Sequence, residues 1–244
     1  MPATEQEAIE RDRNAPHRLH LLRRLQPGGR LLEVGPMTGG FLALARRAGY
    51  EPSAVELDPD CCAFIERVLE LPATQSDDPA AAIDGPYDAI ALFHVIEHLP
   101  DPAAFLASAA DALAPGGVAL IVAPNPEALQ RRALGGLWAH VDAPRHLALI
   151  PPGALVREGA RVGLETALVT ASDEDARRSN GFGWSESLAA CARRRRAVAG
   201  LRRVGHGVTA ALAPIERRRM RGASYTVALR RPRRGQRQRD SSAS

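Results

Sequence analysis

The amino-acid sequence predicts an α/β fold in which helices cover both faces of a mostly parallel, doubly wound sheet. Short apolar runs of strand length alternate with amphipathic helical patterns over residues 30–171, and such alternation is typical of doubly wound sheets. A glycine-rich turn joins the first apolar run, 30–34, to the helical pattern at 41–48. A strand followed by such a turn and a helix binds nucleotide-like ligands at the carboxyl edge of α/β sheets.

Turn residues and apolar patterns predict the remaining elements in chain order. We expect residues 1–15 to be frayed and residues 17–25 to form a helix that ends at Pro27-Gly28-Gly29. Further helices are expected at 61–71, 103–113, 127–137 and 152–162. Further strands are expected at 53–57, 73–76, 86–93, 118–122, 164–170 and 224–229.

The composition indicates one α/β domain with additions. The chain has 244 residues, 45% of them hydrophobic, which is enough for a sizeable core. No apolar run approaches the length of a membrane span, and the polar start, 1–18, lacks the pattern of a secretory signal, so we expect a cytoplasmic protein. Cys61, Cys62 and Cys191 fit neither a disulfide framework nor a usual zinc spacing. All 32 lysine-or-arginine positions hold arginine, which excludes lysine Schiff-base chemistry.

Charge is distributed unevenly along the chain. Residues 1–176 hold 14 Arg against 25 Asp and Glu, a net charge of −11, whereas residues 177–244 hold 18 Arg against 3, a net charge of +15. An acidic body with a basic C-terminal quarter favours a second function or an anionic surface as a partner. We expect no nucleic-acid partner, because the basic residues carry almost no interleaved aromatic side chains.

The glycine-rich turn distinguishes between two classes of ligand. It reads Glu33-Val34-Gly35-Pro36-Met37-Thr38-Gly39, and Gly35 and Gly39 allow the backbone to approach a ligand closely. A dinucleotide site requires a glycine where Met37 stands. An acidic residue at the strand end would also repel a pyrophosphate. The turn therefore favours a ligand that carries positive charge and no phosphate.

Four ordered motifs over residues 30–124 resemble those of class I S-adenosylmethionine (SAM) dependent methyltransferases. The turn is similar to their acidic-x-G-x-G-x-G motif, with Met37 in place of the central glycine, and Glu56 follows at their usual distance. Residues 86–102 resemble the segment around their fourth strand, and Ala114-Pro115-Gly116-Gly117 resembles the turn before their fifth. The resemblance implies a Rossmann-like seven-stranded sheet, whose last strand lies antiparallel beside strand six.

The resemblance also implies a SAM site at the strand ends. Glu56, about 20 residues past the turn, would accept hydrogen bonds from the ribose hydroxyls; the alternative is a helix-capping or surface carboxylate, which suits Asp58 better. Asp77 or Asp78 would lie near the adenine amino group, or else be a solvated loop carboxylate. The expected cofactor-binding residues are Glu33, Gly35, Pro36, Met37, Thr38, Gly39, Glu56, Leu57, Asp77, Phe93 and His94.

Two histidines and a glutamate follow the expected fourth strand. Glu97 and His98 can form a hydrogen-bonded structural pair, with His94 facing the cofactor cleft. The order of these three residues also matches an inverted zinc-protease motif, which needs a long helix. Because Leu99-Pro100-Asp101-Pro102 breaks any helix immediately afterwards, we expect no metal.

A polar loop at 138–147 resembles the W…D-x-P-R-H-L loop of ubiquinone-biosynthesis O-methyltransferases. The resemblance implies that it overhangs the pocket of the methyl acceptor, where His146 or His140 is a candidate general base, because imidazole titrates near neutrality. Alternatively, Arg145 and Asp142 brace the loop and His146 packs beneath it. The expected activity is methyl transfer from SAM to a small-molecule acceptor, with a hydroxyl oxygen as first choice. A nicotinamide-dependent oxidoreductase and a non-catalytic SAM- or nucleic-acid-binding module are the alternatives.

The basic C-terminal quarter is expected to hold a helical insertion before the last strand. Residues 171–184 are polar and glycine-rich, so we expect a mobile loop there, and residues 185–221 carry an apolar stripe among arginines. Gly200, Gly205, Gly207 and Pro214 favour two short helices over one unbroken helix. The insertion is either a lid over the acceptor pocket or a surface that docks on an anionic membrane. The expected units are a helical segment at 1–29, a core at 30–171, the insertion at 172–222, a last strand at 223–230 and a disordered basic tail at 231–244.

Overall fold

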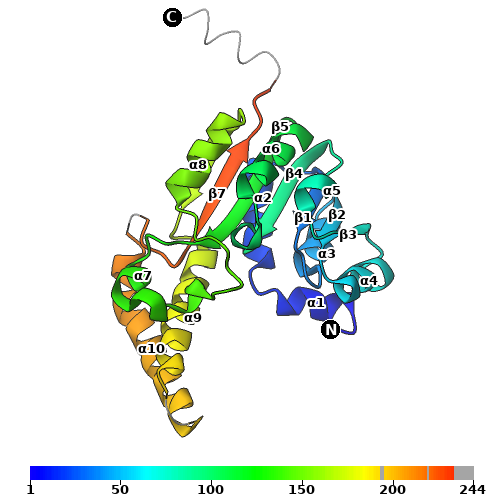
Figure 1. The fold of residues 1–244 in the computed structure, drawn as a ribbon. Helices are drawn as coiled ribbons and strands as arrows, with labels where there is room; N and C mark the ends of the chain where they lie inside the picture. Colours follow the sequence, from blue (N-terminus) through cyan, green and yellow to red (C-terminus); the bar gives the residue numbers. More distant parts are fainter. Residues whose placement is uncertain (193–194, 219, 234–244) are drawn as a thin grey trace, which may run out of the picture.

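The computed structural model describes residues 1–192, 195–218 and 220–233, and it is built around one seven-stranded sheet (Figure 1). The strand order is β3-β2-β1-β4-β5-β7-β6, and β7 runs antiparallel between β5 and β6. The other neighbouring strands pair in parallel, as the sequence predicts. The strands are β1 (Gly29–Val34), β2 (Tyr50–Glu56), β3 (Ala73–Gln75), β4 (Tyr87–Phe93), β5 (Leu113–Pro124), β6 (Glu165–Thr170) and β7 (Ser224–Arg230).

Three of the connecting helices begin with the same short motif. Asp58, Asp78 and Asp101 each precede a proline, and each carboxylate accepts two backbone N–H groups of the first turn. Proline at the first helical position loses no hydrogen bond there, so the Asp-Pro pair fixes where each helix begins. The helices that follow are α4 (Pro59–Val68), α5 (Pro79–Ala82) and α6 (Pro102–Ala112); α3 (Gly40–Arg47), α7 (Leu129–Leu134) and α8 (Pro152–Arg161) complete the core.

Apolar side chains on both faces of the sheet form two buried layers. On one face, Leu31 and Val122 pack with residues of α1 (Glu5–Arg11), α2 (Ala15–Leu25), α3 and α4. On the other, Leu32 and Ile90 pack with residues of α6 and α8 (Figure 1). A parallel sheet covered on both faces needs apolar residues at almost every position of its strands. The continuous apolar runs that predict these strands have this cause.

The expectation that residues 1–15 are frayed was wrong. They contain α1 (Glu5–Arg11) and the start of α2 (Ala15–Leu25). Tertiary contacts hold α1 in place, because Glu5 pairs with Arg46 at 2.6 Å and with Arg47 at 2.8 Å, and Ala8 is fully buried. A seven-residue helix is marginal in isolation, so its own residues give little signal.

The insertion before β7 is a pair of helices, α9 (Glu174–Ala190) and α10 (Arg195–Glu216), which lie side by side and project from the sheet (Figure 1). The expected loop at 171–184 was wrong from Glu174 onward, where α9 begins. The expected break at the glycines was also wrong, because α10 runs through Gly200, Gly205 and Gly207. A Cβ on Gly205 would lie 2.5 Å from the Cα of Ser185, so this glycine allows the two helices to approach closely.

The chain beyond β7 remains paired for a short distance. The Arg231 N–H donates to the Gly117 carbonyl at 2.9 Å, and its own carbonyl accepts from Gly116 at 2.8 Å. The tail expected to be disordered from residue 231 is thus ordered at its start, and residues 234–244 lie outside the described residues. Among the described helices, none is long and apolar enough to cross a membrane.

Candidate active site

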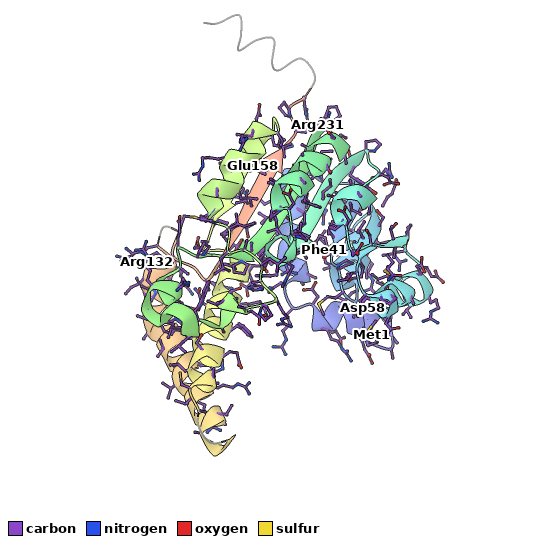
Figure 2. All side chains as sticks on the ribbon, viewed as in Figure 1. Met1, Phe41, Asp58, Arg132, Glu158 and Arg231 are labelled. Carbon is purple, nitrogen blue, oxygen red and sulfur yellow. The ribbon has the colours of Figure 1, made fainter. Side chains whose placement is uncertain are left out.

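The candidate site lies at the edge of the sheet where β1, β2 and β4 end. In Figure 2, Asp58 follows β2 and marks this edge, whereas Arg231 follows the antiparallel β7 and marks the opposite edge. The ends of parallel strands at a point where the strand order reverses, here between β1 and β4, form the usual ligand crevice of such sheets.

The glycine-rich turn contains three residues in the left-handed backbone region, with φ of 68° at Gly35, 52° at Met37 and 65° at Gly39. A Cβ on Gly35 would lie 2.6 Å from Val95, so that position excludes other residues. The Gly39 N–H closes the turn on the Pro36 carbonyl at 2.9 Å. Met37 therefore keeps the conformation that a glycine would take, and its side chain is 69% exposed at the mouth of the site.

Glu56 connects the turn to the end of β2. Its Oε2 accepts the Met37 N–H at 2.8 Å, and its Oε1 accepts the N–H groups of Leu57 and Asp58 at 2.8 and 3.0 Å. Glu56 does not cap the helix, because Asp58 does so. A carboxylate oxygen has two lone pairs, so Oε2 can accept one more hydrogen bond, such as one from a hydroxyl group.

Two adjoining cavities extend from this edge. The smaller one, of about 140 Å³, is lined by residues that include Gly35, Glu56 and Leu57, and the larger one measures about 340 Å³. Asp77 lines both of them with an exposed carboxylate, whereas Asp78 is occupied in capping α5. Of the two aspartates, Asp77 is therefore the one whose carboxylate is not used in capping a helix.

Two buried ionisable residues, Glu33 and Arg18, lie near the ends of β1 and β4. Burial, and then the charge of Asp12, raise the pKa of Glu33 well above its ordinary value. No described residue hydrogen-bonds its Oε2. The Arg18 guanidinium lies 4.2 Å from the centre of the Phe93 ring and lowers the pKa of Glu33 in part.

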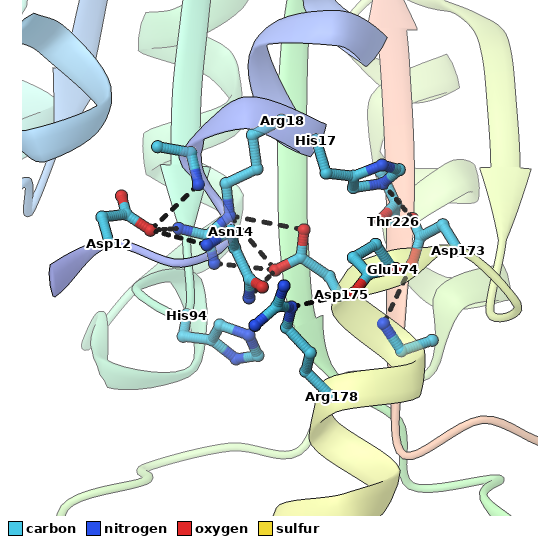
Figure 3. Close-up of polar contacts among 12 residues, drawn as sticks. Asp12, Asn14, His17, Arg18, His94, Asp173, Glu174, Asp175, Arg178 and Thr226 are labelled. Carbon is cyan, nitrogen blue, oxygen red and sulfur yellow. Dashed lines mark hydrogen bonds and ion pairs between the residues drawn. The ribbon is translucent and has the colours of Figure 1, made fainter. Parts of the chain in front are cut away.

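Arg18 lies against Phe93 at the end of β4, a position that the sequence did not reveal. It is buried in α2, and it pairs with Asp175 of α9 at 2.8 Å and with Asp12 at 3.6 Å (Figure 3). The Asn14 amide also donates to Asp175, at 2.7 Å. One more arginine in a helical pattern carries no signal in so arginine-rich a chain.

The expected histidines line a third cavity, of about 420 Å³, between the end of β4, the 138–147 loop and α9. His146 bonds the His140 carbonyl through Nδ1 at 2.8 Å, and its ring lies 4.8 Å from that of His98. His140 is buried between Trp138 and Phe182, and its Nε2 bonds the Ser179 carbonyl at 3.2 Å. Burial lowers the pKa of His140 to about 4, which makes it a weak base at neutral pH.

The expected pairing of Glu97 with His98 was wrong. His98 bonds the Arg145 carbonyl through Nδ1 at 2.9 Å, and no described residue hydrogen-bonds either oxygen of Glu97. Glu97 Oε1 lies 3.6 Å from His94 Nδ1 and 4.0 Å from His146 Nε2. The Glu97 carbonyl accepts the Leu147 N–H at 2.9 Å and so holds the end of the 138–147 loop in place.

The same loop contains the brace that the sequence suggests. The Arg145 side chain donates to Asp142 Oδ2 at 2.9 Å through Nε, and this bond lowers the pKa of Asp142. Bracing and a chemical role for His146 are therefore compatible, because the two use different residues.

Ligand atoms of Glu97, His98 and His146 lie within 4.8 Å of one another. The 4.0 Å between Glu97 and His146 is wider than the roughly 3.3 Å that separates two ligands of a tetrahedral zinc. As placed, these side chains do not close around such an ion.

Comparison with known proteins gives the family. A family model described as a methyltransferase domain matches residues 7–169. The ubiquinone biosynthesis O-methyltransferase of Xanthomonas campestris pv. campestris (strain B100) is 31% identical over 139 residues, 52% of this chain and 54% of that protein. Its counterpart in Thiobacillus denitrificans is 29% identical over 162 residues, 59% of this chain and 67% of that protein. The chain thus spans about half the length of the first of these relatives.

Solved structures share the fold at lower identity. A SAM-dependent methyltransferase from Mesorhizobium loti superimposes with a TM-score of 0.59 at 17% identity, covering 91% of this chain and all of that one. This likeness shows the fold alone, and the family model, which covers more than half of the chain, shows the family. The chain therefore belongs to the family of proteins that carry this methyltransferase domain.

Proposed function

We propose that this protein transfers the methyl group of SAM to a hydroxyl oxygen of a small-molecule acceptor. The observation that carries the proposal is the state of His146. A carbonyl oxygen only accepts hydrogen bonds, so the Nδ1 that bonds the His140 carbonyl holds the proton. Nε2 of the neutral ring is then a proton acceptor. His146 lines the third cavity, which His94 also lines at the end of β4.

The residues at the sheet edge fit the charges of SAM. The remaining acceptor position of Glu56 Oε2 suits a ribose hydroxyl, and Asp77 suits the adenine amino group. The unpaired oxygen of Glu33 suits the ammonium group, and Arg18 suits the carboxylate. When bound there, SAM supplies a methyl group activated by its sulfonium.

The protein's own contribution is then alignment and proton removal. Holding the acceptor oxygen in line with the methyl carbon accounts for most of the expected rate, because it replaces a bimolecular encounter with a positioned one. As the oxygen attacks, His146 Nε2 takes the hydroxyl proton, and the electron pair of the breaking carbon–sulfur bond stays on sulfur. His140, with its low pKa, is the support of this loop.

The names of the relatives support oxygen as the methylated atom. Both matched proteins are ubiquinone biosynthesis O-methyltransferases, and the 138–147 loop resembles theirs in sequence. The alternatives predict different ligands. A nicotinamide-dependent enzyme would bind NADH, and a non-catalytic module would bind SAM without consuming it.

Two measurements on the purified protein test the proposal. Calorimetry should detect binding of SAM and none of NADH. Incubation with SAM and a panel of phenols should release S-adenosylhomocysteine only when a hydroxylated acceptor is present. NADH binding without SAM binding would favour the oxidoreductase, and SAM binding with no turnover on any acceptor would favour the module.

We further propose that residues 185–221 dock on an anionic membrane surface. On α10, Val204 and Ile215 are 54% and 39% exposed, beside the exposed Arg203 and Arg217. Exposed apolar and cationic side chains together suit an acidic lipid surface. Liposome sedimentation should detect binding to anionic vesicles at low salt that fades at about 0.5 M salt, where surface charges are screened within a few ångström. An Arg203→Glu/Arg217→Glu variant should not sediment, and equal failure of the native chain on anionic and neutral vesicles would contradict the proposal.

A further inference from the structure

Glu97 is a buried carboxylate that lines a cavity and has no hydrogen-bond partner among the described residues. Its side chain lines the third cavity, which is also lined by His94, His140 and His146, yet Glu97 is only 1% exposed. No described residue hydrogen-bonds either of its oxygens. Because burying an unpaired charge is costly, such groups are normally paired with a donor or a cation. A cation beside this carboxylate would therefore offset the cost of its burial.

The groups around Glu97 show where that charge can arise. The nearest are His94 Nδ1 at 3.6 Å and His146 Nε2 at 4.0 Å. Tyr225 of β7 lies close enough that the charge of Glu97, after burial, raises the pKa of its hydroxyl, which also has no partner among the described residues.

The other charged side chains of the cavity are already occupied. Arg145 donates to Asp142, and Arg178 donates to Glu174 at 3.0 Å. Neither arginine pairs with Glu97 in the described chain. The imidazoles of His94 and His146 are thus the groups best placed to become its cation.

We propose that Glu97 is a positioning residue for methyl transfer, which stabilises His146 as an imidazolium while that ring holds the acceptor's proton. The proposal rests on the proposed function. In the step, the acceptor O–H bond breaks and its proton goes to His146 Nε2. The oxygen forms the new bond to the methyl carbon, and the carbon–sulfur pair leaves with sulfur.

Whether the contact between Glu97 and His146 is attractive depends on the protonation of His146 Nε2. With the ring proton on Nδ1, the lone pair of His146 Nε2 lies 4.0 Å from Glu97 Oε1, and the two atoms are both acceptors. Protonation of Nε2 turns this unfavourable contact into an attractive one. The effect is strong because the site is shielded from water, where charges interact through a low dielectric.

The test compares Glu97→Gln with the native enzyme on acceptors of different acidity. The variant keeps the shape of the side chain and removes its charge. With phenol, which has a proton to lose, kcat should fall about 30-fold or more, a part of the roughly 10²–10⁴-fold that general-base catalysis supplies. With 4-nitrophenol, already ionised at pH 8, the loss should be less than about 3-fold, because no proton has to be taken.

Glu216→Gln is the matched control. Glu216 is also a fully buried glutamate with one unpaired oxygen, but it lies outside this cavity, where it accepts from Gln130 and Trp184. The kcat of the Glu216→Gln variant should equal that of the native enzyme on both acceptors. SAM affinity measured by calorimetry should be unchanged in Glu97→Gln and in Glu216→Gln.

Three results would overturn the inference. Equal losses on phenol and 4-nitrophenol in Glu97→Gln would make the residue structural and leave the proposed function intact. Loss of native activity in EDTA, with recovery on adding Mg²⁺ or Zn²⁺, would mean that an ion supplies the positive charge. Absence of turnover by the native enzyme on every hydroxyl acceptor would overturn both the proposed function and the inference.

Discussion

Glu56 Oε2 accepts the Met37 N–H at 2.8 Å, and this single bond joins the glycine-rich turn to the end of β2. The two strand ends that would hold the cofactor are therefore fixed to one another before any ligand arrives. A pre-formed site of this kind costs little conformational entropy on binding.

Replacing Glu56 should weaken SAM binding severely. Glu56→Ala loses a charged acceptor worth about 1.5–3 kcal/mol for a ribose hydroxyl, so the dissociation constant measured by calorimetry should rise about 10-fold or more. Glu51→Ala, an exposed position on the same strand, is the control and should bind normally. Unchanged affinity in Glu56→Ala would remove this residue from the site.

Met37→Gly should stabilise the protein. Met37 has φ of 52°, and a side chain in the left-handed region costs about 1–2 kcal/mol that glycine avoids. Thermal unfolding should shift upward by about 2–4 °C per kcal/mol gained. Thr38→Gly serves as the comparison, because Thr38 is not among the positive-φ residues and should gain nothing. A lower melting temperature for Met37→Gly would show that the exposed methionine side chain makes contacts worth more than the strain.

Glu33 should make stability depend on pH. Burial raises its pKa above the ordinary value of 4.5, so the folded chain retains this proton to a higher pH than the unfolded chain. Its contribution is complete below about pH 4.5 and is lost as pH rises through the higher folded pKa. Glu33→Gln should therefore be more stable than the native chain at pH 8 and bind SAM more weakly. Urea titrations at several pH values would give the free energy of unfolding of both proteins. If this free energy changed with pH in the same way in Glu33→Gln and in the native chain, the prediction would be wrong.

His146 and His140 should fail in different ways. His146→Asn should reduce turnover about 100-fold or more while SAM affinity is retained, because a general base contributes about 10²–10⁴-fold. His140→Asn should mainly lower the melting temperature, since it removes a buried ring packed between Trp138 and Phe182. Normal turnover per folded molecule in His146→Asn would assign that residue to packing alone.

The sequence predicted the sheet because its signals are local. Apolar runs mark buried strands, and the Asp-Pro pairs at Asp58, Asp78 and Asp101 mark helix starts through bonds made within one turn. The position of Glu56 at the end of β2, beside the glycine-rich turn, was also predictable, since its spacing from the turn follows from one strand–helix–strand unit.

Other features depend on contacts between segments far apart in the chain. Helix α1 exists because Glu5 reaches Arg46, and Gly205 is tolerated in α10 because Ser185 packs against it. The proximity of Arg18 to Asp175 and of Glu97 to His146 arises only when the fold brings these segments together. No pattern within a single segment contains that information.

The central claim, that this protein methylates a hydroxyl oxygen with SAM, is tested most directly by mass spectrometry. The enzyme is incubated with a metabolite extract and SAM carrying a ¹³CD₃ methyl group, and the label is located in the products by fragmentation. The account predicts a new labelled methyl ether, formed in equal amount with S-adenosylhomocysteine and absent when His146→Asn replaces the native enzyme. Label found on nitrogen or carbon would contradict the account. An enzyme that binds SAM but does not consume it would also contradict it.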